Sequence, residues 1–390
     1  SLKREARMSV HSFELLGADT KREHFEKRVG SLGVQVQTLV SGLGRGMQVI
    51  ELSAGNTKVS VLPQRGMGIW KMISGELTLG WNSPVRGPVN PACVPLSEPS
   101  GLGWLDGFDE LVARCGLVNN GAPDFDSQGK LLHGLHGRIA NLPAHSLNVS
   151  IDDAAGTITL AGAVDETRFL VQSLQMKTSL VLSADRPCIE WTDTIENLSD
   201  RPTTFQMLYH INFGPPLLGA GAELVAAVEE LAPRDAGSMS DIGTWNRYDS
   251  PCPGRAEQVH FATIRSHSEG VASAMLVAPD AKNAVCVAWR ADTLPCFALW
   301  KNQGGLADGY VTGLEPATNF PNARSFEESQ GRVVTLGPHE SVRFDLSLEH
   351  LSGSRLLERR KQIEAVMASR AAKMHEHPRS GWSAGASANR

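Results

Sequence analysis

Apolar and polar residues alternate with a period of two in short segments along most of the chain, as expected for β-strands with one buried face. The turn-forming stretches 152–156 and 184–187 separate consecutive segments and favour antiparallel pairing. The pattern therefore predicts a mainly β protein. The alternating segments are residues 34–39, 47–52, 58–62, 157–160, 169–182, 189–195, 204–213, 272–277, 284–289 and 342–348.

One segment inside this strand-rich region has the apolar spacing of a helix. In residues 104–115, apolar side chains recur at i, i+3, i+4 and i+7, starting at Phe108. We expect this helix to pack against the sheets through that face. Its charged residues Asp109, Glu110 and Arg114 should then be exposed to solvent.

The two ends of the chain differ in composition from the middle. Residues 356–373 are rich in Ala, Glu, Lys and Arg, and they predict a C-terminal helix on the outside of the protein. The charged stretch 21–28 predicts a short surface helix. Residues 380–390 are small and polar, so we expect them to be disordered.

No internal repeat and no linker divides the 390 residues. We therefore expect one large two-sheet β-sandwich of antiparallel sheets with few peripheral helices. The 38 glycines and 21 prolines agree with many strands joined by turns. We place the sandwich at residues 46–351, after an N-terminal extension with the first strand (1–45) and before a C-terminal helix and disordered tail (352–390).

Charge and cysteine content narrow the class of protein. The net charge is −5 without a block of like charge, which disfavours a nucleic-acid partner. No apolar stretch approaches the roughly 18 residues that a membrane helix requires. The six cysteines form no C-x-x-C pair, and they are too few for a disulfide framework in a chain of this length. We expect a reducing, cytoplasmic setting.

The segment 132–143, Leu-His-Gly-Leu-His-Gly-Arg-Ile-Ala-Asn-Leu-Pro, holds a first group of candidate functional residues. Its glycines would let the backbone approach a ligand closely. The histidines, His133 and His136, have the H-x-x-H spacing that can supply two metal ligands. No H-E-x-x-H motif or nearby carboxylate supports a metal, and surface histidines on a loop explain the spacing equally well.

Two further candidates lie on predicted strands. His210 and Asn212 fall on one face of the segment 204–213 by the period of two, just before Gly-Pro-Pro. Glu315 stands in a run of low charge, and apolar surroundings raise a carboxyl pKa toward the range of a general base. A core histidine and a glutamate in a surface turn are the alternatives.

Together these segments resemble the motifs of the galactose mutarotases, or aldose 1-epimerases. The shared motifs, in order, are H-G-x-x-x-N-L-P, Y-H-x-N-F and L-E-P-x-x-x-F-P-N-A. The resemblance covers residues 46–351 and is closest to an uncharacterised bacterial branch of aldose-1-epimerase-like proteins. It implies a galactose mutarotase-like β-supersandwich and a sugar-binding pocket.

The resemblance also implies roles for individual residues. His136 would contact the sugar, His210 would be the general acid and Glu315 the general base. Arg65, which follows an early strand, matches the position of a sugar-binding arginine in the family.

Four further residues complete the expected pocket. Asn212 and Arg138 would hold the sugar, and Trp300 and Lys301 would stand where the family has a sugar-binding aspartate. The chain departs from the family after the second histidine, where it has Ile-Asn-Phe-Gly in place of Ser/Thr-Tyr-Phe-Asn.

The expected function is the exchange of sugar anomers by acid–base ring opening. No phosphate loop or dinucleotide fingerprint appears, so the expected reaction uses no cofactor. The expected partner is a small-molecule sugar, with neither nucleic acid nor membrane, and a homodimer is left open. Three alternatives remain: a sugar or uronate isomerase with a metal on His133, His136, His210 and Glu315, a lyase acting on an oxidised sugar, and a sugar-binding protein without turnover.

Overall fold

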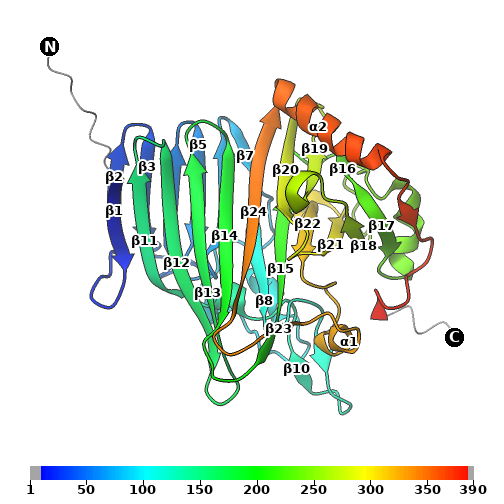
Figure 1. The fold of residues 1–390 in the computed structure, drawn as a ribbon, viewed down its shortest axis with the longest axis horizontal. Coiled ribbons are helices and arrows are strands. Elements are labelled where there is room, and N and C mark those ends of the chain that lie inside the picture. Colours follow the sequence, from blue (N-terminus) through cyan, green and yellow to red (C-terminus); the bar gives the residue numbers. More distant parts are fainter. Residues whose placement is uncertain (1–9, 385–390) are drawn as a thin grey trace.

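The computed structural model describes residues 10–384, in which two large β-sheets lie face to face (Figure 1). Strands make up 46% and helices 13% of the structure, which confirms the predicted mainly β class. Neighbouring strands pair antiparallel, and the parallel pair of β17 and β25 is the exception within the two sheets. No helix in the described residues is long and apolar enough to cross a bilayer.

The first sheet has nine strands and forms the front layer in Figure 1. Its central strands are long, and consecutive strands joined by tight turns make up most of it. In spatial order the strands are β1 (Val10–Leu16), β11 (Ala144–Asp152), β12 (Thr157–Arg168), β13 (Gln172–Ser183), β14 (Cys188–Asn197), β24 (Ser341–Ser352), β20 (Asn283–Arg290), β19 (Val271–Val277) and β16 (Glu223–Ala226).

The second sheet has fourteen strands and lies behind the first. In spatial order they are β2 (Phe25–Val29), β3 (Leu32–Thr38), β4 (Gln48–Ala54), β5 (Thr57–Leu62), β6 (Gly68–Ser74), β8 (Val112–Leu117), β15 (Thr203–Phe213), β22 (Val311–Ala317), β21 (Cys296–Asn302), β18 (Gln258–Ile264), β17 (Val228–Pro233) and β25 (Lys373–Met374). Two short strands pair off this path, β7 (Leu77–Leu79) with β6 and β23 (Val334–Leu336) with β15.

The remaining elements are short and lie at the periphery. Strands β9 (Asp124–Phe125) and β10 (Leu131–His133) pair as a two-stranded antiparallel ribbon. The α-helices are α1 (Arg324–Ser329) and α2 (Gly353–Ala368), and α2 runs across the top of the first sheet in Figure 1. The 3₁₀ turns are η1 (Pro91–Cys93), η2 (Gly103–Gly107), η3 (Ile139–Asn141), η4 (Ala236–Thr244), η5 (Ser268–Gly270) and η6 (Leu306–Asp308).

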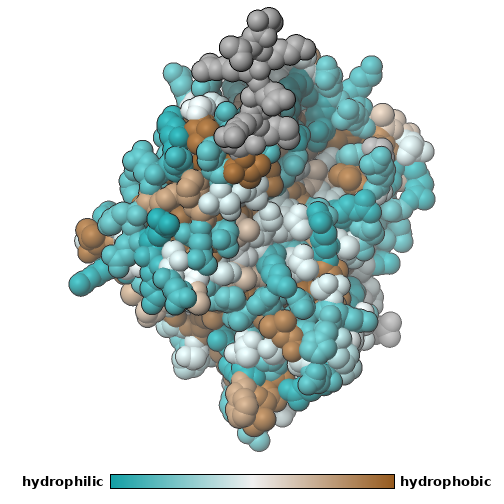
Figure 2. Space-filling model, turned by 60° about the vertical axis from the view of Figure 1, so that its left-hand side comes forward, coloured by the Kyte–Doolittle hydropathy of each residue, from teal (hydrophilic) through white to brown (hydrophobic). Residues whose placement is uncertain are grey.

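The main hydrophobic core fills the space between the two sheets. One continuous cluster of buried side chains takes residues such as Leu180 and Phe344 from the first sheet and Val59 and Tyr209 from the second. Polar side chains cover most of the side that carries the N-terminal strands, and apolar groups appear there in small patches (Figure 2). The alternation read from the sequence therefore corresponds to a real division between core and solvent.

The predicted helix at residues 104–115 is wrong. The chain forms the 3₁₀ turn η2 and then β8, all of whose residues are buried. Arg114 lies inside the core, where its guanidinium pairs with Asp193 of β14 at 2.6 Å. Asp109 and Glu110 are also buried, at 8% and 0% exposure, so the predicted charged face does not exist.

The predictions for the chain ends are confirmed in part. The C-terminal helix exists as α2, which packs Leu356 and Ile363 on the outer face of the first sheet. The predicted helix at residues 21–28 is wrong, because this stretch leads into strand β2. Strands β1 and β2, which precede the predicted sandwich boundary at residue 46, are also integral parts of the sheets.

The predicted disorder of residues 380–390 is wrong for the part that the structure describes. Trp382 is buried at 7% exposure and packs on Phe320, and Ser383 is buried as well. Residues 385–390 lie outside the described part of the chain.

Candidate functional site

The candidate site lies on the face of the second sheet that points away from the first. Along β15, Tyr209 and Ile211 enter the core between the sheets, so His210 and Asn212 point to the opposite face. The β15–β22 register pairs Ile211 with Leu314 and thereby sets His210 beside Glu315. Adjacent antiparallel strands thus bring together two residues that are far apart in the sequence.

His210 and Glu315 are in contact. The imidazole Nε2 of His210 lies 3.2 Å from the carboxylate Oε1 of Glu315, but the two atoms do not form a hydrogen bond. The residues are only 4% and 3% exposed, and Oε1 of Glu315 has no hydrogen-bond donor among the described residues. A buried carboxyl oxygen without a partner is costly, which is typical of groups retained for function.

Asn212 fixes the orientation of the His210 ring. Its amide nitrogen donates to the carbonyl oxygens of Glu110 and His210, both at 3.1 Å. Its amide oxygen is therefore the acceptor that faces Nδ1 of His210, at 2.6 Å. Nδ1 must carry a proton for this contact, which leaves the lone pair of Nε2 directed at Glu315. Asn212 is fully buried, so the structure gives it a positioning role and not the predicted sugar contact.

Burial shifts the pKa values of the pair in opposite directions. The pKa of Glu315 rises well above its ordinary value, because burial penalises the charged carboxylate. Burial, and then the nearby ring of His136, lower the pKa of His210 to about 3. Burial thus disfavours the charged form of both side chains, which favours a proton on Glu315 over one on His210.

His136 enters the same site from the loop after β10. Its backbone has φ of 57°, an uncommon conformation for a residue with a side chain, and its ring centroid lies 5.4 Å from that of His210. Nδ1 donates to the carbonyl oxygen of Asn120 at 2.8 Å, so Nε2 is free to accept. Burial lowers the pKa of His136 to about 4, which keeps the ring neutral.

Aromatic side chains surround these polar groups. Phe108 lies 4.9 Å from the His210 ring, Trp300 lies 5.3 Å from it, and Trp104 lies 4.7 Å from the His136 ring. Trp81 extends the cluster by its contact with Phe108. Such rings suit the apolar face of a sugar. Sequence reasoning predicted Trp300 but missed the others; the apolar residues of segment 104–111 gave a signal for Trp104 and Phe108, and none was seen for Trp81.

Each nitrogen of the buried Arg65 guanidinium donates to a protein group. It pairs with Glu110 at 2.7 Å, donates to the side chain of Asn141, and donates to the carbonyl oxygen of Gly107 at 2.8 Å. Arg65 thus fixes η2 and its neighbours. Arg65 is only 1% exposed and each of its guanidinium nitrogens already has a protein acceptor, so the structure shows it as a support of η2, and its sugar contact stays a prediction.

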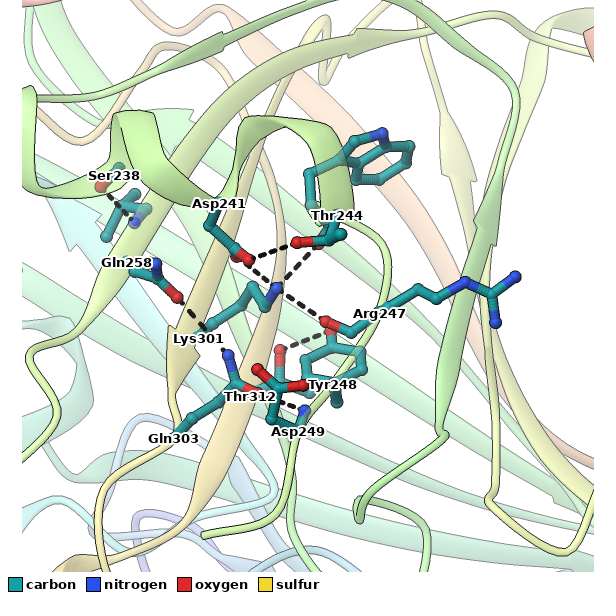
Figure 3. Close-up of polar contacts among 12 residues, drawn as sticks. Ser238, Asp241, Thr244, Arg247, Tyr248, Asp249, Gln258, Lys301, Gln303 and Thr312 are labelled. Atoms are coloured by element: carbon teal, nitrogen blue, oxygen red, sulfur yellow. Dashed lines mark hydrogen bonds and ion pairs between the residues drawn. The ribbon is translucent and has the colours of Figure 1, made fainter. Parts of the chain in front are cut away.

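Lys301 does not share the site with Trp300, although the sequence prediction placed both there. Neighbours on a strand point to opposite faces, and Lys301 points to the inner face of β21. Figure 3 shows its ammonium group bonded to the carboxylate of Asp241 and to the carbonyl oxygens of Trp245 and Arg247, at 3.1 and 2.8 Å. Lys301 therefore fastens η4 and the chain that follows it to the second sheet.

The two other residues predicted from the 132–143 segment, His133 and Arg138, line a cavity beside the site. No group of three or more His, Cys, Asp or Glu side chains in residues 10–384 is arranged to hold a metal ion.

The arrangement of the two sheets is that of galactose mutarotase-like proteins, as predicted. The crystal structure of a "putative aldose 1-epimerase" from Klebsiella pneumoniae subsp. pneumoniae MGH 78578 matches with a TM-score of 0.91 and 27% identity, over 95% of this chain and 99% of that chain. A galactose mutarotase-like protein from Clostridium acetobutylicum matches with a TM-score of 0.58 and 16% identity, over 83% and 100% of the two chains. A "putative aldose 1-epimerase" from Escherichia coli K12 matches with a TM-score of 0.54 and 16% identity, over 79% of this chain and 100% of that chain.

Within this fold, the chain belongs to the family described as "Domain of unknown function (DUF4432)", which matches residues 44–350. No curated protein matches the sequence.

Proposed function

We propose that this protein is an aldose 1-epimerase, which interconverts the anomers of a sugar without a cofactor. The observation that carries the proposal is the buried contact of His210 with Glu315, which leaves a carboxyl oxygen without a hydrogen-bond partner among the described residues. The Klebsiella protein, which is 27% identical over nearly the whole chain, bears the same activity in its name and adds support.

One acid and one base are sufficient for this reaction. One member of the pair takes the proton from the hydroxyl group on C1 while the other protonates the ring oxygen, and the bond between C1 and the ring oxygen breaks. The open aldehyde rotates about its C1–C2 bond, and the ring closes on the other face as both protons return. Each group can contribute about 10²–10⁴-fold.

The resemblance assigns Glu315 as base and His210 as acid, which requires the proton to start on His210. Burial raises the pKa of Glu315 and lowers that of His210, which favours a start on Glu315. Both starts use the same two groups, because opening transfers the proton between them and closure returns it. His136, with a free Nε2 acceptor, would orient a sugar hydroxyl, and Trp300 would stack on the apolar face of the sugar.

The test is the rate of anomer exchange, measured by NMR over a panel of hexoses, pentoses, deoxy sugars and uronates. We expect at least one sugar to exchange faster with the protein than without it. Glu315→Gln and His210→Asn should each lower turnover by at least about 10²-fold while sugar binding persists. His145→Asn, on the exposed surface of β11, is the matched control.

Two results would overturn the proposal. Binding of a sugar without accelerated exchange for any member of the panel would define a sugar-binding protein. Loss of activity in chelator that added metal restores would favour the metal-dependent isomerase, in which His133 and His136 would also be ligands.

A further inference from the structure

A cavity of about 610 Å³ lies beside the candidate site. Its walls include residues of three segments: 94–104, which leads into η2; 131–138, which holds β10 and the chain before η3; and 168–172, the turn between β12 and β13. This volume is in the range of small-molecule sites.

The cavity carries positive charge without compensation from its walls. Arg138 and Arg168 both line it, and none of its lining residues is an aspartate or a glutamate. This is unusual in a chain whose net charge is −5. Neither arginine forms an ion pair within residues 10–384, whereas other arginines such as Arg65 and Arg114 pair with carboxylates.

Glu166 is near enough for the charge of Arg138 to lower its pKa, but its carboxylate bonds to neither guanidinium group of the cavity. Its oxygens accept hydrogen bonds from the backbone of Leu117 at 2.9 Å and of Val118 at 3.3 Å, and from the side chain of Gln172 at 3.2 Å. Glu166 is 1% exposed and does not line the cavity. The guanidinium groups therefore remain available to an anion from outside.

The cavity and the candidate site share a wall. Trp104 lines the cavity, and its ring lies 4.7 Å from that of His136 and 6.3 Å from that of His210. Leu135 and Gly137, the neighbours of His136 in the chain, line the cavity as well. The cavity is therefore adjacent to His210 and Glu315, and a substituent of a sugar ring bound there would enter it by passing beside Trp104.

We propose that this cavity binds an anionic group of the sugar substrate, either the carboxylate of a sugar acid or the phosphate of a sugar phosphate. The inference rests on the proposed function, because it places the sugar ring at His210 and Glu315. Guanidinium groups recognise both anions through paired hydrogen bonds, and a cavity without carboxylates does not repel them. The substrate class is then an anionic sugar and not a neutral hexose.

The test measures binding by calorimetry with four probes: glucose, glucuronate, glucose 6-phosphate and inorganic phosphate alone. We expect glucuronate or glucose 6-phosphate to bind at least about tenfold more tightly than glucose. Arg138→Gln and Arg168→Gln should each remove about tenfold of that preference for the anionic sugar over glucose. Arg138→Lys should restore part of it, and thermal unfolding should show that the variants fold.

Arg45→Gln is the matched control, because Arg45 is exposed and does not line the cavity. The relative affinities of glucuronate, glucose 6-phosphate and phosphate alone identify which anion is preferred. Equal affinities for neutral and anionic sugars, or a preference that survives both arginine substitutions, would overturn the inference.

Failure of this inference and failure of the proposed function give different results. Binding of an anionic sugar that depends on Arg138 and Arg168, without accelerated anomer exchange, contradicts the epimerase and keeps the anion site. Accelerated exchange of neutral sugars that depends on Glu315, with no preference for anions, supports the epimerase and contradicts the anion site.

Discussion

Gly313 and Glu315 share one face of β22, and a Cβ atom on Gly313 would lie 2.5 Å from Oε1 of Glu315. The same atom would lie 3.1 Å from the ring of His210 and 3.3 Å from Trp300. Gly313 thus provides the space in which the acid–base pair and the aromatic wall meet. Its lack of a side chain is a steric requirement of the site, independent of backbone conformation.

We therefore expect Gly313→Ala to lower the rate of anomer exchange by about 10²-fold, because even a displacement of about 1 Å misplaces the reacting groups. Gly243→Ala is the matched control, since nothing lies within 4 Å of a Cβ atom at that position. Kinetics and thermal unfolding of both variants check the prediction. Full activity of Gly313→Ala would show that the Glu315 side chain can shift without loss of function, so that Gly313 is not a steric requirement of the site.

The motif resemblance named His210 and Glu315 together, and the structure brings them into contact, but the sequence could not give the contacts that orient His210. Alternation along β15 placed His210 and Asn212 on one face, which the structure confirms. The hydrogen bond of Asn212 to the carbonyl oxygen of Glu110 depends on the pairing of distant strands, which no local pattern reveals. The opposite directions of Trp300 and Lys301 follow from the same alternation and could have been predicted.

Segment 104–115 shows why the helix prediction failed. Its apolar residues face two different clusters, because Leu111 enters the core between the sheets and Phe108 enters the aromatic cluster of the site. A strand buried on both faces has no alternation, so a helical spacing can arise by chance. The charged residues of this segment are buried because their partners, such as Asp193, come from other parts of the chain.

The second prediction concerns pH. His210 has a folded-state pKa of about 3 and His136 one of about 4, against about 6.5 in an unfolded chain. Between these values the unfolded state binds more protons, so the contribution of each ring to the free energy of unfolding rises with pH up to about 6.5 and is constant above it. Both rings should therefore stay neutral at pH 5.

Ring-nitrogen NMR shifts and the unfolding free energy as a function of pH check this prediction. His210→Asn should remove its share of the pH dependence between about pH 3 and 6.5. A His210 ring that titrates near pH 6.5 in the folded protein would contradict the burial of the pair.

The third prediction concerns the charged pair in the core. Arg114 of β8 pairs with Asp193 of β14, and Asp193 also accepts from Thr178 at 2.6 Å and from Tyr209 at 2.9 Å. Asp193→Ala would leave a buried guanidinium unpaired, so we expect a loss of about 3–5 kcal/mol in the free energy of unfolding. Thr178→Val removes one neutral partner and should cost about 1–3 kcal/mol.

Chemical denaturation measures these losses. The exposed pair of Lys177 and Glu196, on the neighbouring strands β13 and β14, gives the control. Glu196→Gln should cost about 1 kcal/mol or less, because solvent screens an exposed pair. A loss for Asp193→Ala no larger than that of Glu196→Gln would show that the core pair contributes no more than a surface pair.

The last prediction concerns the C-terminal segment, which packs close to the candidate site. Trp382 lies 4.7 Å from the ring of Phe320, in a cluster against which Trp300 also packs. Ser383 donates to the backbone oxygen of Arg234. The side chain of Arg234 in turn pairs at 3.1 Å with Glu257, which accepts at 2.8 Å from the indole nitrogen of Trp300.

These linked contacts, from Ser383 through Arg234 and Glu257 to Trp300, imply that the C-terminal segment helps to hold Trp300 against the site. Trp382→Ala should free the segment after α2 to protease cleavage. It should also raise the KM for the sugar by about tenfold, with a smaller effect on kcat, because the role we propose for Trp300 is in binding and not in proton transfer. Trp382→Phe keeps an aromatic ring on Phe320 and should retain most of the affinity. If Trp382→Ala exposes the segment to protease but leaves KM unchanged, then the segment stabilises the fold without supporting the sugar-binding wall.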